Sequence, residues 1–128
     1  MAVEAHDFTL NDRSVRYYED GIQHGRSILL LHGGIGDAKL NWFDVIPDLA
    51  DDYHILAPDL PGFGGTASLP AGSTLSDMVD WVLAFLESQG IEQVVMIGNS
   101  FGAVIARLIA TQYPQTVAAI VLINGGFI

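Results

Sequence analysis

The sequence predicts an α/β fold with three layers, in which a mostly parallel sheet of about six strands carries helices on both faces. Short apolar runs rich in β-branched residues alternate along the chain with longer segments of helical periodicity. Most of the strand-like runs are apolar throughout, which is typical of strands that are buried on both faces of a parallel sheet. Hydrophobic residues make up 50% of the 128 positions, enough for a sizeable core.

The predicted elements begin with two strands, at residues 6–10 and 14–19, in which apolar and polar side chains roughly alternate. Asn11 and Asp12 favour a tight turn between these strands, so the pair is expected to form a hairpin at one edge of the sheet. A third strand follows at residues 27–31.

Next come a short helix at residues 42–49, which Pro47 weakens in its middle, and a fourth strand at residues 54–57. The clearest helix spans residues 75–88, where apolar side chains recur at the spacing of one helical face. Thr74 precedes this helix in a sequence that resembles a capping box.

The last predicted elements are a fifth strand at residues 94–97, an almost entirely apolar helix at residues 101–112 and a sixth strand at residues 118–123. The sixth strand begins with Ala118, ends with Ile123 and contains neither a charge nor a proline. Its β-propensity is high.

A Gly-x-Ser-x-Gly pentapeptide at residues 98–102 joins the fifth strand to the helix that follows it. Ser100 therefore falls on a strand-to-helix turn, where the backbone is strained and Gly98 and Gly102 let neighbouring backbones pass closely. The pentapeptide alone fits an ordinary glycine-rich turn equally well, but this context makes Ser100 a candidate nucleophile.

Two further motifs follow strands earlier in the chain. His32, Gly33 and Gly34 come directly after the third strand, and residues 59–66, Asp-Leu-Pro-Gly-Phe-Gly-Gly-Thr, come after the fourth. Sites on parallel sheets form beyond the carboxyl ends of the strands, so these motifs and Ser100 are predicted to converge in space.

Together, and in this order, the three motifs resemble the α/β-hydrolase superfamily, and the resemblance covers nearly all of the chain. It implies that Ser100 is the catalytic nucleophile and that the amides of Gly34 and Phe101 form the oxyanion hole. Residues 59–66 are then a structural turn without chemistry. The resemblance also implies a structural role for four residues near the site: His32, Gly33, Gly98 and Gly102.

Asn41, Trp42 and the residues around Ser100 are similar to hydrolases that cleave carbon–carbon bonds in ring-cleavage products. Lipases and simple esterases share most of these residues. The resemblance therefore implies a small-molecule ester or ketone-type substrate. The loop from His32 to Asn41 is shorter than in the carbon–carbon cleaving group, so Asn41 is assigned no role.

The usual partners of such a serine do not follow Ser100. In the family an acid and a histidine come later in the chain than the nucleophile, whereas residues 101–128 contain no Asp, Glu or His. The predicted topology keeps all four histidines out of hydrogen-bond reach of Ser100; they are His6, His24, His32 and His54. We therefore expect weak or no activity from this chain alone.

By its length the chain is expected to be a single domain, residues 1–128, that forms the N-terminal half of an α/β-hydrolase core and is truncated at the sixth strand. Such an ending leaves residues 118–123 as an unprotected edge, and a homo-oligomer joined through this strand is expected. The competing interpretation is a non-catalytic half-fold that associates with itself or with a complementary chain.

Composition argues against several other classes of protein. Five basic and 15 acidic residues give a net charge of -10, which repels nucleic acid and anionic membrane surfaces. The sequence has no cysteine, signal peptide or long apolar span, so we expect a cytoplasmic protein with no membrane partner, cofactor or metal. The glycine spacing at residues 62–67 resembles a dinucleotide-binding motif. Pro70 follows it, however, and no helix is predicted before residue 75, so no helix N-terminus would face a pyrophosphate and this function is rejected.

Overall fold

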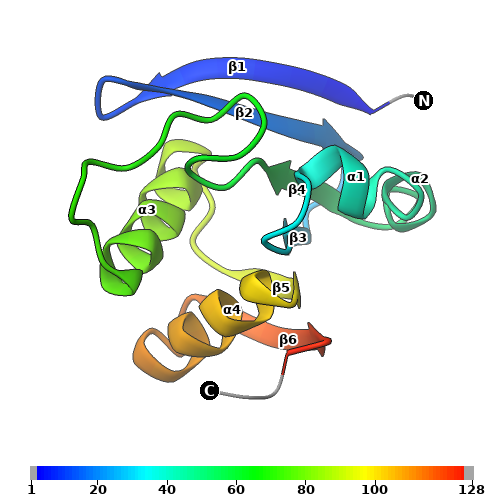
Figure 1. The fold of residues 1–128 in the computed structure, drawn as a ribbon. Coiled ribbons are helices and arrows are strands. Elements are labelled where there is room, and N and C mark those ends of the chain that lie inside the picture. Colours follow the sequence, from blue (N-terminus) through cyan, green and yellow to red (C-terminus); the bar gives the residue numbers. More distant parts are fainter. Residues whose placement is uncertain (1–2, 126–128) are drawn as a thin grey trace.

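The computed structural model describes residues 3–125, and within this part of the chain six strands form one sheet that carries four helices (Figure 1). The strands are β1 (Glu4–Leu10), β2 (Arg13–Asp20), β3 (Ser27–Leu31), β4 (His54–Pro58), β5 (Val94–Asn99) and β6 (Val117–Ile123). The helices are α1 (Ala38–Trp42), α2 (Ile46–Leu49), α3 (Leu75–Ser88) and α4 (Phe101–Gln112).

The sheet has the strand order β1-β2-β4-β3-β5-β6. β3 pairs in parallel with β4 and β5, and β6 pairs in parallel with β5. β1 and β2 are antiparallel and form the predicted edge hairpin, whose turn residues Asn11 and Asp12 have φ of 51° and 65°. These left-handed conformations match a tight hairpin turn. The predicted α/β class with a mostly parallel sheet is confirmed.

Alternate residues of each central strand serve two separate cores, one on each face of the sheet. Leu29 and Leu31 of β3 face α3 and α4, whereas Ile28 and Leu30 face α1 and α2. All four of these side chains are almost completely buried. Helices therefore cover both faces, as the apolar strands predict.

Helix α3 has the predicted bounds because both of its ends carry clear signals. The Thr74 side chain accepts a hydrogen bond from the Asp77 backbone N–H, and the Thr74 N–H donates to Asp77 Oδ2 at 2.7 Å. This reciprocal pair is a capping box. At the other end, Gly90 has a φ of 71°, a conformation that ends a helix at little cost.

The single helix predicted at residues 42–49 is wrong, because two short helices occupy residues 38–42 and 46–49, with a turn between them. The Asp37 side chain caps α1 by accepting the Leu40 N–H at 2.9 Å, so the first helix starts earlier than predicted. Pro47 lies in the first turn of α2, where its missing N–H has no helical partner to lose. Pro47 thus begins a second helix instead of weakening one.

Strand β5 runs two residues further than predicted, because Gly98 and Asn99 pair with Leu122 and Ile123 of β6. The strand therefore leads directly into Ser100. Among the described residues, no helix has both the length and the apolar character needed to cross a membrane.

Replacing Phe85 with alanine should strongly destabilise the fold. Its ring is fully buried and contacts the rings of Tyr17 and Trp81 at centroid distances of 5.3 and 5.8 Å. We expect Phe85→Ala to lower the free energy of unfolding, measured in urea, by about 3–5 kcal/mol. The control Ile22→Ala removes a side chain that is 69% exposed and should cost less than about 0.5 kcal/mol. Equal losses in the two variants would contradict this description of the core.

Candidate active site

Ser100 occupies a strained turn between β5 and α4. Its φ of 54° and ψ of -112° lie outside the conformations that residues with a side chain favour, at a cost on the order of 1–3 kcal/mol. Its N–H donates to Ile123 O at 2.8 Å, and its carbonyl accepts from the amides of Ala103 and Val104. These bonds hold the turn, and the Ser100 side chain remains exposed at its apex.

The glycines on either side of Ser100 are required by close backbone contacts. A Cβ atom at Gly98 would overlap the carbonyl of Gly102, and one at Gly102 would overlap the carbonyl of Leu31. The turn therefore packs directly against the carboxyl end of β3. Any larger residue at either position would push Ser100 away from the loop that follows β3.

An open cavity of about 470 Å³ lies beside Ser100. It is lined by Gly33, Gly34, Ile35, Asn41, Asn99, Ser100, Phe101 and Asn124. The structure thus brings together the predicted nucleophile and both residues predicted to supply oxyanion-hole amides. Within residues 3–125, the N–H groups of Gly34 and Phe101 find no hydrogen-bond acceptor. The remaining predicted residues are buried: His32, Gly98 and Gly102.

The His32 ring links the loops that follow β3 and β4. Its Nε2 accepts the Leu60 N–H at 2.9 Å, so its proton is on Nδ1, which donates to Gly33 O at 2.7 Å. Burial lowers the pKa of His32 below its ordinary value, although the bond to Gly33 opposes this effect. With both nitrogens engaged, His32 does not serve as a proton acceptor for Ser100.

Asp59 holds the loop after β4 against the start of α1. This side chain is fully buried, and its Oδ1 accepts the Ala38 N–H at 2.9 Å while its Oδ2 accepts the Gly65 N–H at 3.0 Å. Both carboxylate oxygens are therefore occupied by backbone donors. The arrangement is the structural turn that the sequence predicts for residues 59–66.

Sequence reasoning missed Asn41, which lies at the centre of a hydrogen-bond network beside Ser100. Its Oδ1 accepts the Gly33 N–H at 3.1 Å and a hydrogen from Asn99 Nδ2 at 2.8 Å. Asn99 Oδ1 in turn accepts from Asn124 Nδ2 at 3.2 Å. Loop length could not reveal this role, because it depends on helix α1 turning residue 41 back toward β5.

The three histidines other than His32 contact groups that are not part of the cavity beside Ser100. His54, at the start of β4, has its Nε2 2.6 Å from Glu19 Oε2, and the Nε2 of His6 lies 3.0 Å from the other oxygen of Glu19. The Nε2 of His24 lies 3.1 Å from Ala50 O. Because Ser100 follows the carboxyl end of β5, the start of β4 is at the opposite end of the parallel strands.

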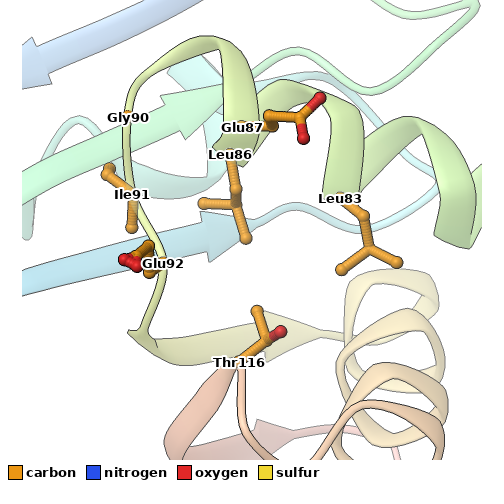
Figure 2. A pocket seen from close by; sticks show the side chains of 7 residues that line it. All are labelled: Leu83, Leu86, Glu87, Gly90, Ile91, Glu92 and Thr116. Atoms are coloured by element: carbon orange, nitrogen blue, oxygen red, sulfur yellow. The ribbon is translucent and has the colours of Figure 1, made fainter.

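A second cavity, of about 440 Å³, lies near the starts of β5 and β6 and contains none of the predicted site residues (Figure 2). Figure 2 shows Leu83 and Leu86 pointing from α3 toward Thr116. No group of three or more His, Cys, Asp or Glu side chains among residues 3–125 is arranged to hold a metal ion. The cavity beside Ser100 is therefore the candidate active site.

Comparison with known proteins supports this assignment of the fold. The family model described as the alpha/beta hydrolase fold matches residues 26–127. The chain belongs to the α/β-hydrolase family. A dihydrolipoyllysine-residue acetyltransferase component of an acetoin cleaving system from Cupriavidus necator is 36% identical over 110 residues. A 2-hydroxymuconate semialdehyde hydrolase from Pseudomonas sp. strain CF600 is also 36% identical, over 103 residues.

Solved structures include the same fold. A serine hydrolase from the polyaromatic-hydrocarbon-degrading bacterium Cycloclasticus zankles has a TM-score of 0.86 and 31% sequence identity over 94% of this α/β-hydrolase chain. The chain covers 45% of that structure. It matches the two relatives over 86% and 78% of its own length but spans only 29% and 36% of theirs. The predicted family is confirmed.

The buried His32 should make stability fall as the pH is lowered. The unfolded ring takes up a proton below about pH 6.5, whereas the folded ring has a lowered pKa, so the unfolded state binds more protons there. We expect the free energy of unfolding to decrease below pH 6.5 more steeply in the wild type than in His32→Gln. One proton contributes at most about 1.4 kcal/mol per pH unit to this slope.

Urea unfolding at about pH 7.5 and about pH 5.5 measures this difference. The His32→Gln side chain can still accept the Leu60 N–H but does not titrate. Because the other histidines are unchanged in the variant, their contributions cancel in the comparison. Identical pH slopes in the two proteins would show that His32 is not held neutral by the fold.

Proposed function

We propose that this chain carries the nucleophile and the oxyanion hole of a serine hydrolase that acts on an ester or a carbon–carbon bond. One observation carries the proposal. Ser100, strained and exposed at the start of α4, lines a cavity together with Gly34 and Phe101, whose backbone amides have no hydrogen-bond acceptor within residues 3–125. Backbone donors fixed beside a nucleophile are the requirement for stabilising an oxyanion.

In the proposed reaction with an ester, Ser100 Oγ attacks the carbonyl carbon and gives up its proton to solvent water, and the carbonyl oxygen becomes an oxyanion. The Gly34 and Phe101 amides donate to that oxygen, and the positive end of the α4 dipole adds to the stabilisation. Collapse of the intermediate breaks the bond to the alkoxide, which leaves as an alcohol after protonation, and water then hydrolyses the acyl–serine bond. One such donor contributes about 2.7–4 kcal/mol to the transition state.

Removal of the proton from Ser100 limits this reaction in the chain alone. Among the described residues, the contacts of His32 commit both of its nitrogens, and His6 and His54 face Glu19. Oxyanion stabilisation and binding without a working triad still give about 10³–10⁴-fold acceleration over water in serine proteases. We therefore expect slow turnover, restricted to esters with good leaving groups.

The similarity to a 2-hydroxymuconate semialdehyde hydrolase supports a small-molecule, ketone-type substrate, and simple esters are the alternative. The cavity is open to solvent, and Ile35 in its lining is 88% exposed. A substrate with an apolar portion would cover this side chain and remove its apolar surface from water.

Covalent labelling with a fluorophosphonate tests the nucleophile. We expect Ser100 Oγ to attack phosphorus and displace fluoride in the wild type, and we expect Ser100→Ala to lose both labelling and p-nitrophenyl acetate turnover beyond the buffer rate. The control Ser76→Ala changes an exposed serine on α3 and should label like the wild type. Mass spectrometry locates the adduct. Equal labelling of Ser100→Ala and wild type would refute the proposal.

A second candidate function is self-association through β6, with the chain acting as a half-fold that pairs with a like chain. Within the described residues β6 pairs only with β5 and forms one edge of the sheet. Three of its large apolar side chains are exposed: Val121 at 46%, Leu122 at 37% and Ile123 at 39%. An exposed apolar edge strand without a charge favours pairing with another chain.

A charge on this edge should weaken the proposed association. We expect sedimentation velocity to show a dimer of the wild type at micromolar concentration and a monomer of Val121→Lys, because lysine on an edge strand opposes strand pairing. The control Val45→Lys places the same charge at a side chain that is 40% exposed and far from β6 in sequence. A wild type that sediments as an ideal monomer would contradict the proposed dimer.

A further inference from the structure

We infer that Asn41 is a positioning residue that holds the Gly34 amide in place opposite Ser100; this inference rests on the proposed function of these residues. Asn41 lies on α1, whereas Ser100 follows β5, so the two residues are far apart in the sequence. The connection is made by hydrogen bonds to the Asn41 side chain.

Backbone groups fix which way the Asn41 amide points. The Gly33 N–H is a donor and must face Oδ1, at 3.1 Å. The carbonyls of Asp37 and Ile35 are acceptors and must face Nδ2, at 3.0 and 3.4 Å. Asn41 Oδ1 is therefore also the acceptor for Asn99, whose Nδ2 lies 2.8 Å away.

These four contacts use the full capacity of the Asn41 amide, which has two donor hydrogens and two acceptor positions. No hydrogen-bonding capacity is left for a substrate. Asn41 therefore lines the cavity as part of the scaffold and acts through the groups it holds.

The first of these groups is the Gly33 N–H, which lies one peptide before the Gly34 amide. Asn41 accepts this N–H and so fixes one side of Gly33, while His32 Nδ1 donates at 2.7 Å to the Gly33 carbonyl, in the peptide that carries the Gly34 amide. In a trans peptide the C=O and the following N–H point in opposite directions. With its carbonyl turned toward the buried His32, this peptide directs the Gly34 N–H away from the ring, on the side where Gly34 lines the cavity.

The second group is Asn99, which immediately precedes Ser100. Because Asn41 Oδ1 accepts from both Gly33 and Asn99, one oxygen atom sets the spacing between the loop after β3 and the nucleophile turn. The loop and the turn lie close together, since a Cβ at Gly33 would be in van der Waals contact with Ser100 Cβ, at 3.4 Å. Loss of Asn41 frees both the loop and the turn to move apart.

Kinetics of Asn41→Ala test this inference with a readout that a general loss of structure would not give. The oxyanion exists only in the transition state, so a misplaced Gly34 amide should lower kcat for p-nitrophenyl acetate and the rate constant of fluorophosphonate labelling about 10- to 100-fold. KM should change less than about two-fold. Leu40→Ala, which removes an exposed neighbour on α1, should match the wild type.

Asn99→Ala removes only one of the two donors to Asn41 Oδ1 and should give a smaller decrease in the same rate constants. Asn41→Ala labelling within about two-fold of the wild type would overturn the inference, and so would a rise in KM with unchanged kcat.

Amide hydrogen exchange separates this inference from the proposed function. The Gly33 N–H should be protected in the wild type and should exchange faster in Asn41→Ala, because it loses its acceptor. This exchange result is expected whether or not Ser100 reacts with the probe. Failure of labelling in the wild type would reject the proposed function, whereas an unprotected Gly33 amide in the wild type would reject the role of Asn41.

Discussion

Hydrogen bonds between the loops at the carboxyl ends of β3, β4 and β5 are the interaction on which the candidate site depends. His32 joins the first loop to the second through Leu60, and Asn41 joins the first loop to β5 through Asn99. Asp59 adds a buried link from the second loop to α1. His32 and Asp59 are buried, and buried polar groups are costly when left unpaired, so their links restrict the loops to one arrangement.

This arrangement explains why the strained turn at Ser100 persists. Its backbone conformation is unfavourable by itself, but β6 accepts its N–H and the helix α4 begins at the next residue. The missing side chains at Gly98 and Gly102 let the turn press against β3. Packing of the sheet thus offsets the local strain and places Gly34, Ser100 and Phe101 around the same cavity.

Much of the fold and part of the site could be predicted from local patterns. The capping box at Thr74 and the helical periodicity after it defined α3 to the residue, and glycine spacing identified the turn at Ser100. The single helix predicted across Pro47 is wrong because proline fits both a helix start and a helix break. The role of Asn41 could not be predicted, since it depends on contacts between residues 58 positions apart in the chain.

The crystal structure of the fluorophosphonate adduct would test the account most directly. The phosphonyl oxygen stands in for the oxyanion, and we expect it at about 2.7–3.1 Å from the backbone nitrogens of both Gly34 and Phe101. Asn41 should keep its contacts with Gly33 and Asn99 in that structure. A phosphonyl oxygen turned to solvent, with neither amide within hydrogen-bond distance, would contradict the account.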